Sequence, residues 1–155
     1  MKTINIDWQT FEFYVQALIS KLEEEATPGL IVGLSRGGLP LATTLSNRLN
    51  VPMIPLEWSL RDNPIRDTEK FRNILKTYKD CEILLVDDLI DSGKTYIDIW
   101  STFEAYWSDC SVKVTPVVML YNTEAFNKMP NWNKPVSVVK FQRSKVPEWF
   151  VWPWE

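Results

Sequence analysis

Histidine is absent from the 155 residues of the sequence. This excludes Ser-His-Asp and Cys-His nucleophile systems and every metal site with a histidine ligand. The two cysteines, Cys81 and Cys110, are too few for a structural zinc site, and nothing around them indicates a secreted disulfide framework. We expect both cysteines to be packing residues.

Long hydrophobic runs and a strong net charge are also missing. No apolar run approaches the roughly 18 residues that span a bilayer, and Asp7 and Glu12 stand where a signal peptide would be apolar. Seventeen basic and twenty acidic side chains give a net charge of −3, which is too mild and of the wrong sign for a dedicated nucleic-acid or anionic-membrane binder. We therefore expect one cytoplasmic domain over residues 1–155, with neither nucleic acid nor membrane as a partner.

Glycine is scarce and unevenly placed. Of five glycines, Gly33, Gly37 and Gly38 fall in one short segment and Gly93 in another. Glycine lets the backbone come close to another group or adopt conformations that other residues avoid. The two segments are therefore candidate sites of close backbone approach.

Strand and helix patterns alternate along the chain. Asp7 or Thr10 can cap a first helix that ends at the acidic run 23–25. The next elements are expected as strands at 30–34, 51–56, 82–86, 112–120 and 136–141 and as helices at 39–49 and 95–107. Pro52 and Pro55 favour an edge or irregular position for the second strand. The alternation predicts an α/β fold with a single parallel sheet flanked by helices.

The segment 58–80 differs from the rest. It carries six basic and four acidic side chains, the pair Asn63-Pro64 and few core-type residues before Phe71. It is the only long polar segment of the sequence. We expect it to be a mobile lid with a partly helical second half.

The most informative segment follows the apolar strand 82–86 and reads Asp87-Asp88-Leu89-Ile90-Asp91-Ser92-Gly93-Lys94-Thr95. A turn of this kind at a helix start offers backbone N–H groups and the positive end of the helix dipole to a phosphate. Adjacent carboxylates at a strand end are costly unless a ribose diol or a hydrated Mg²⁺ meets them. Together the two features describe a site for a ribose 5-phosphate. A P-loop is rejected because position 88 is Asp where that motif needs glycine, and the alternative that the acid pair is merely solvated does not explain the Ser-Gly-Lys-Thr turn beside it.

Three blocks of the sequence resemble type I phosphoribosyltransferases. The block 83–95 resembles the signature of that family for phosphoribosyl pyrophosphate (PRPP), and Leu-Ser-Arg-Gly-Gly-Leu at 34–39 resembles its pyrophosphate loop. The tail 147–155, with three tryptophans, resembles the C-terminus of the xanthine-guanine and hypoxanthine branch, in which an aromatic residue stacks on the purine. The resemblance implies a phosphoribosyltransferase-type core with a C-terminal base-binding arm, here 142–155.

The resemblance also implies residue roles. Asp87 and Asp88 would hold the ribose hydroxyls, partly through Mg²⁺. The 5-phosphate loop would be Asp91, Ser92, Gly93, Lys94 and Thr95. Pyrophosphate would be bound by Ser35, Arg36 and Gly37, and the Ser35–Arg36 peptide can be cis. The catalytic residues would be Asp91, as candidate general base, and Arg36, which neutralises the leaving group.

The base would contact the C-terminal arm. Trp149 would stack on it and the backbone of Phe150 would read its edge, whereas we expect Trp152 and Trp154 to pack the arm on the core or on a second subunit. One position departs from the purine branch: its lysine that donates to the 6-oxo group is replaced by Asn122, which donates without charge and with shorter reach. The identity of the base is therefore open.

These features predict a pentosyltransferase of purine salvage. It would use PRPP and Mg²⁺ to convert a free nucleobase, a 6-oxopurine by resemblance, to its nucleoside 5-monophosphate, with release of pyrophosphate. We expect a homo-oligomer, either a dimer or a tetramer. The alternatives are a PRPP-binding regulatory or accessory protein without turnover, and a transferase for a non-purine acceptor.

Overall fold

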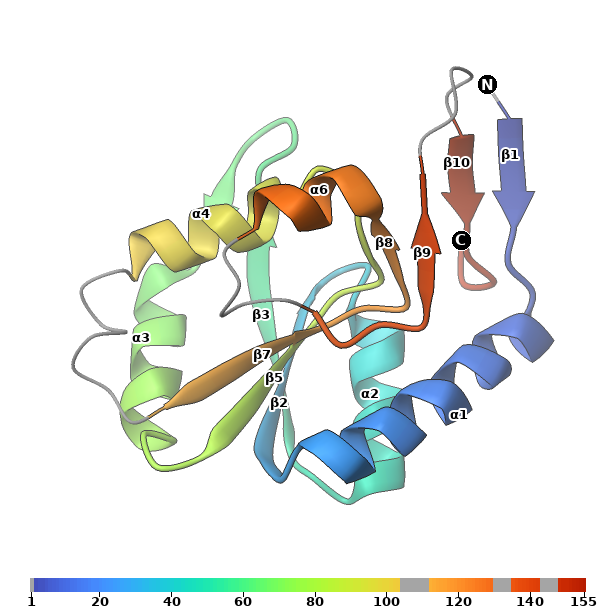
Figure 1. Cartoon of the computed structure of the whole chain (residues 1–155). Coiled ribbons are helices and arrows are strands. Elements are labelled where there is room, and N and C mark those ends of the chain that lie inside the picture. The colour runs from blue at the N-terminus through green and yellow to red at the C-terminus, as the bar shows by residue number, and fades with distance from the viewer. Residues whose placement is uncertain (1, 104–111, 130–134, 143–147) are drawn as a thin grey trace.

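The computed structural model describes residues 2–103, 112–129, 135–142 and 148–155 (Figure 1). Its centre is a five-stranded sheet in the order β4-β3-β2-β5-β7. The four long strands run parallel and are β2 (Pro28–Ser35), β3 (Met53–Ser59), β5 (Glu82–Val86) and β7 (Lys113–Val117). The two-residue strand β4 (Ile65–Arg66) adds an antiparallel edge. The prediction of a parallel α/β sheet is confirmed.

Helices cover both faces of this sheet. Successive side chains of a strand point to opposite faces, and those of β2 and β5 alternate between two separate hydrophobic clusters. One cluster takes in α1 (Trp8–Glu25) and α2 (Leu39–Leu49), and the other takes in α3 (Thr68–Thr77) and α4 (Lys94–Thr102). Both faces are buried, which explains why Ile83, Leu84, Leu85 and Val86 of β5 form a continuous apolar run and do not alternate.

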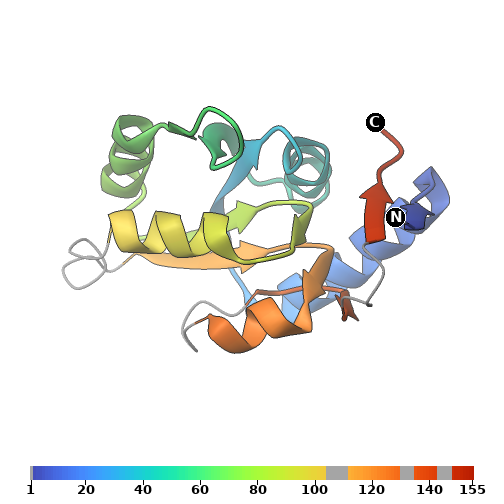
Figure 2. The same cartoon turned by 90° about the horizontal axis from the view of Figure 1, so that it is seen from above.

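Two small parallel sheets complete the fold. The first has the order β6-β8-β9 and joins β6 (Leu89–Ile90), β8 (Leu120–Asn122) and β9 (Val139–Phe141), with α6 (Thr123–Lys128) following β8. The second pairs β1 (Lys2–Asn5) with β10 (Glu148–Val151) and so joins the two ends of the chain. Figures 1 and 2 show this pair beside the beginning of α1.

The predicted elements match the structure closely in the first half of the chain and less closely in the second. Asp7, and not Thr10, caps α1, because its Oδ1 accepts a hydrogen bond of 2.7 Å from the Thr10 backbone N–H. The single strand predicted at 112–120 is wrong, since the chain leaves the central sheet after Val117 and enters the small sheet at Leu120. The predicted end of the helix 95–107 and Cys110 lie outside the described residues.

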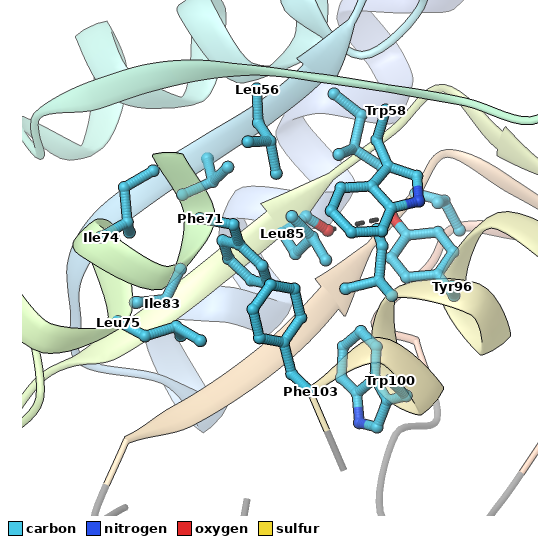
Figure 3. Close-up of a cluster of buried hydrophobic side chains, with 14 of the residues drawn as sticks. Leu56, Trp58, Phe71, Ile74, Leu75, Ile83, Leu85, Tyr96, Trp100 and Phe103 are labelled. Atoms are coloured by element: carbon cyan, nitrogen blue, oxygen red, sulfur yellow. Dashed lines mark hydrogen bonds between the residues drawn. The ribbon is translucent and has the colours of Figure 1, made fainter. Parts of the chain in front are cut away.

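The segment 58–80 is divided between core and surface, which corrects the expectation that all of it forms a lid. Trp58 is only 3% exposed, and α3 inserts Phe71, Ile74 and Leu75 into the hydrophobic core (Figure 3). These apolar positions lie at helical spacing, and burial fixes the helix on the sheet. Residues 61–66, which make up most of the turn 60–64 and all of β4, are exposed without interruption. The lid prediction is therefore limited to the turn 60–64 and β4.

The part of the arm 142–155 that the structure describes packs on the chain's own core. Trp152 is buried and stacks on Trp154 with ring centroids 5.2 Å apart. Trp154 in turn meets Phe11 of α1 edge-on at 5.4 Å. Pro147 lies outside the described residues. No helix in the described part of the chain is long and apolar enough to cross a membrane.

Candidate active site at the carboxyl ends of β2 and β5

Two loops that are far apart in the sequence touch at one edge of the central sheet. β2 and β5 are parallel neighbours, with Gly33 in register with Val86, so the loops that follow them leave the sheet side by side. A Cβ atom on Gly38 would lie 2.9 Å from the Asp87 Cα, and one on Gly37 would lie 2.8 Å from Asp88 Oδ2. A side chain at position 38 would clash with backbone, and one at position 37 would displace the Asp88 carboxylate, which explains why a glycine-poor chain keeps two glycines in a row here.

The first loop, 35–38, connects β2 to α2. Its Ser35–Arg36 peptide bond is cis, which confirms the expectation for this bond. The Gly38 backbone N–H returns to the Leu34 carbonyl at 2.9 Å, and the Leu39 N–H donates to the Arg36 carbonyl at 3.1 Å. These bonds make a tight turn whose outer face carries Ser35, Arg36 and Gly37, the residues predicted to bind pyrophosphate.

The second loop begins with the acid pair, Asp87 and Asp88. The Asp88 backbone N–H donates to Asp87 Oδ1 at 2.9 Å, and the Leu89 N–H donates to Asp88 Oδ1 at 2.7 Å. These bonds hold the two carboxylates in place, with Asp88 Oδ2 against Gly37 of the 35–38 loop. Both side chains are half-buried, so a ligand can reach them although much of their hydration is lost.

Burial sets the electrostatics of the acid pair. Desolvation raises the pKa of Asp87 well above its usual value, the charge of Asp88 raises it further, and the charge of Arg61 lowers it. Desolvation also raises the pKa of Asp88, with a smaller contribution from Glu155. Two carboxylates held in this way attract a cation or hydroxyl donors more strongly than exposed carboxylates do.

The predicted phosphate loop ends at the start of α4. Gly93 is the N-cap of this helix and has a φ of +77°, a left-handed conformation that favours glycine. The glycine cap itself supplies no side-chain oxygen to the first turn, and the Lys94 N–H makes only a long bond of 3.4 Å to Ser92 Oγ. The N–H groups of this turn and the positive end of the helix dipole can therefore meet an anionic ligand. Ser92 and Lys94 are exposed here, and Asp91 and Thr95 are half-buried.

Trp149 and Phe150, two of the residues predicted to contact the base, differ in how accessible their rings are. Trp149 is 45% exposed, and its ring lies 5.6 Å from the guanidinium carbon of Arg61. Phe150 packs edge-on against Phe141 at 5.1 Å, so its side chain belongs to the core while its backbone remains on β10. The accessible aromatic face at this end of the site is therefore that of Trp149.

Asn122 has a structural role that the sequence analysis missed. It is only 4% exposed, and its Oδ1 accepts a 3.0 Å hydrogen bond from the Glu124 backbone N–H. This is the N-cap interaction of α6, for which asparagine is a preferred residue. The run Asn-Thr-Glu at a strand end carries the signature of such a cap and could have been recognised.

Three further residues near the acid pair were also missed. Tyr96 is buried and donates a hydrogen bond of 3.0 Å to the Leu85 carbonyl (Figure 3). Arg61 and Glu155 act on the acid pair through their charges. Nothing in the sequence separates Arg61 from the other basic residues of its polar segment, so it could not have been singled out.

Comparisons with known proteins agree with this arrangement. The family model for the phosphoribosyl transferase domain matches residues 6–155. None of the curated proteins matches the sequence significantly.

Three solved structures share the fold over nearly the whole chain. A purine phosphoribosyltransferase from Pyrococcus horikoshii is 22% identical, with a TM-score of 0.67 over 100% of this chain and 95% of the other. A xanthine-guanine-hypoxanthine phosphoribosyltransferase from Helicobacter pylori is 20% identical, with a TM-score of 0.67 over 98% and 91%. A hypothetical protein from Neisseria gonorrhoeae, with bound ppGpp, is 15% identical, with a TM-score of 0.79 over 99% and 89%.

The family model matches almost the whole chain, and the sheet and the paired loops agree with it. The chain therefore belongs to the phosphoribosyl transferase domain family.

Proposed function

We propose that the protein is a purine-type phosphoribosyltransferase, which converts PRPP and a free nucleobase, a 6-oxopurine, to a nucleoside 5-monophosphate and pyrophosphate. The observation that supports this most strongly is the contact between the 35–38 loop and the acid pair. It combines a loop suited to pyrophosphate, two carboxylates suited to a ribose diol and a helix N-terminus suited to a phosphate. These are the three parts of PRPP.

Mg²⁺ fits this site as an ion that arrives with the substrate. In the part of the chain that the structure describes, no group of three or more acidic or cysteine side chains could hold a metal alone. Mg²⁺ keeps several waters and is commonly bound by one or two carboxylates together with substrate phosphates. Asp87 and Asp88 would hold it in that way, and its charge would offset the burial that raises the pKa of both carboxyls and the charge of Asp88 that raises the pKa of Asp87 further. When bound, the ion supplies positive charge beside the pyrophosphate.

The chain's own residues would then carry the reaction. A ring nitrogen of the base attacks the anomeric carbon, the bond to pyrophosphate breaks, and its electron pair leaves with the pyrophosphate through an oxocarbenium-like state. Arg36 would neutralise the leaving group, and the backbone N–H groups of 92–95 would hold the 5-phosphate. Asp91 would accept the proton that the nitrogen of the base loses. The two loops mainly orient the reactants and stabilise the charges that separate.

Selection of the base would be weak. Trp149 would stack on any planar base, because every base has an aromatic face. The oxygen of Asn122 accepts the cap bond of α6, and its amide nitrogen would donate to a 6-oxo group without charge. The backbone of Phe150 would supply the remaining polar contacts. The names of the relatives from Pyrococcus horikoshii and Helicobacter pylori favour a purine.

A second candidate is a PRPP-binding or nucleotide-binding regulator without turnover. The relative from Neisseria gonorrhoeae, solved with bound ppGpp, has a TM-score of 0.79 and supports this reading. A ribose that carries phosphates at both ends would occupy the same two loops. Transfer to a non-purine acceptor and assembly into a dimer or tetramer both stay predictions.

A panel of bases separates these candidates. The protein is incubated with PRPP, Mg²⁺ and one of hypoxanthine, guanine, xanthine, adenine or orotate, and both nucleotide and pyrophosphate are quantified. We expect the two products in equal amounts with at least one 6-oxopurine. PRPP binding without product for any base would favour the regulator, and product only with orotate would favour the non-purine acceptor.

A further inference from the structure

The turn 60–64 is fastened at both of its ends to one carboxylate of α4. Asp98 Oδ2 accepts hydrogen bonds from Trp58 Nε1 at 2.9 Å and from Arg66 Nε at 2.7 Å, and its Oδ1 accepts one from an Arg66 terminal nitrogen at 3.2 Å. Trp58 lies just before the turn and Arg66 just after it, and the two residues pair across the β3–β4 ladder. One side chain therefore holds both ends of the turn.

This carboxylate lies one helical turn beyond the phosphate loop. Asp98 is four residues after Lys94, the first residue of α4. The hydrogen bonds from Arg66, with a further one from Trp58, lower the pKa of Asp98, so it remains charged at neutral pH. The hydrogen bonds that hold the turn are therefore charge-assisted. Their acceptor, Asp98, belongs to α4, the helix whose N-terminus we assign to the 5-phosphate.

The turn places Arg61 next to Trp149, on the side from which its charge reaches the acid pair. The Arg61 guanidinium carbon lies 5.6 Å from the centroid of the Trp149 ring, and its charge acts on Asp87. It is therefore close to the face expected to stack on the base and to the acid pair expected to hold the ribose. A guanidinium is well suited to bind phosphate oxygens in pairs, and it stacks on aromatic rings.

We propose that Asp98 is a positioning residue that acts through Arg61: by holding both ends of the turn on α4, it sets where the Arg61 guanidinium lies relative to the acid pair and Trp149. Arg61 itself would contact the phosphate oxygens of PRPP. The inference rests on the proposed function for the identity of the substrate. The link from Asp98 to the turn does not depend on it.

The chain provides a matched control for a merely structural ion pair. Arg48 of α2 and Glu12 of α1 form a two-bond pair at 2.6 Å and 2.6 Å, and both side chains are partly exposed, as are Arg66 and Asp98. Exposed pairs of this kind contribute little to stability. If Asp98 had only that role, Asp98→Ala and Glu12→Ala would have the same small effects.

Hydrogen exchange on the protein without ligand tests the first half of the proposal. The Asp67 N–H is bonded to the Glu57 carbonyl at 3.1 Å and reports on the closed β3–β4 ladder. We expect Asp98→Ala to speed exchange over 59–67 by about tenfold or more, because the ladder opens locally. Glu12→Ala should leave this segment unchanged. Equal exchange of 59–67 in wild type and Asp98→Ala would overturn the proposal whether or not the protein is an enzyme.

A double-mutant cycle tests the second half. Arg61→Ala and Asp98→Ala should each raise the KM for PRPP about tenfold with little change in kcat, as expected for a lost contact to bound substrate. If Asp98 acts through Arg61, the double variant should show the same tenfold rise in the KM for PRPP, since the two changes remove one interaction. A hundredfold rise in this KM, which is the product of the single effects, would overturn the proposal.

The cycle also separates this inference from the proposed function. If no base is turned over, the same four proteins are compared by calorimetry with PRPP and Mg²⁺, and the same non-additivity is expected in the dissociation constant. If wild type does not bind PRPP, the proposed function fails and the assignment of Arg61 to its phosphates fails with it. The exchange result for Asp98 would still decide whether that residue positions the turn.

Discussion

Asp87→Asn should stabilise the protein at neutral pH in the absence of ligand. Asp87 is half-buried beside Asp88, and burial together with the neighbouring charge raises its pKa well above the usual value near 3.8. A carboxylate that resists ionisation in the folded state is a net cost to folding once the pH forces it to ionise. Asparagine has almost the same shape and removes that cost.

The expected gain follows from two opposing effects. Each unit by which the pKa is raised corresponds to about 1.4 kcal/mol of lost stability at high pH. The asparagine oxygen can keep the 2.9 Å bond from the Asp88 N–H, but its new amide hydrogens need acceptors, and leaving them unpaired costs about 1–3 kcal/mol. We expect the removal of the buried charge to outweigh this cost, so Asp87→Asn should unfold at a higher Tm than wild type, by about 2–4 °C for each kcal/mol gained in a chain of this length.

The pH dependence of the free energy of unfolding checks independently whether Asp87→Asn stabilises the protein. Between the unfolded and the folded pKa of Asp87, the folded state binds more protons, so the free energy of unfolding of wild type falls as the pH rises above about 4. Asp87→Asn lacks this contribution. Its advantage should be absent near pH 3, where the carboxyl is protonated in both states, and complete above the folded pKa.

Urea denaturation of both proteins from pH 3 to pH 8 measures this difference. Asp98→Asn is the matched control, because Arg66 lowers the pKa of Asp98, and removal of that charge should reduce stability at pH 7. The two Asp→Asn substitutions should therefore have opposite signs. If Asp87→Asn is less stable than wild type across the whole range, the acid pair is not strained by its burial and the reasoning is wrong.

Three further predictions concern the site. Asn122→Ala should lower the free energy of unfolding by about 0.5–2 kcal/mol because it removes the α6 cap, whereas Asn122→Asp should keep the cap. Asn122→Lys should lose the cap and sharpen the preference for 6-oxopurines, as measured by kcat/KM ratios over the panel of bases. Trp149→Ala should weaken every accepted base by about 1–3 kcal/mol, seen as a rise in the KM of each. Gly38→Ala, whose Cβ would meet the Asp87 backbone at 2.9 Å, should lower the Tm more than Gly93→Ala, which has room for a Cβ and suffers only from its φ of +77°.

The part of the fold that holds the two loops could be read from the sequence because each element there has a strong local signal. After Glu82, β5 is apolar to its end at Val86, as expected for a strand buried on both faces. The glycines after β2 mark a close approach to another segment, and the glycine before α4 marks a turn with a positive φ. The order strand, glycine turn, helix then predicts that the two loops leave the same edge of the sheet.

The pairing of β1 with β10 could not be read in this way. Both are four-residue strands with mostly exposed or half-buried side chains, so neither has a clear alternation. What makes them strands is their mutual hydrogen bonding from opposite ends of the chain, and a local pattern carries no information about so distant a partner.

Side-chain roles were harder to predict than loop positions. The chemistry of Asn122 suits a donor to the base and a helix cap equally well, and only the 3.0 Å bond to the Glu124 N–H identifies the cap. The polar composition of 58–80 places Trp58 in the expected lid, yet the residue is buried against Phe103 with ring centroids 6.1 Å apart. Sequence gives the residue type, and the three-dimensional neighbours decide its use.

Calorimetric titration of PRPP with Mg²⁺ into wild type and into the double variant Asp87→Asn, Asp88→Asn tests the central claim most directly, namely that the 35–38 loop and the acid pair form one PRPP site. We predict Mg²⁺-dependent binding to wild type and its loss in the double variant, which should remain folded and at least as stable in urea. Binding of PRPP with wild-type affinity to the double variant would contradict the account.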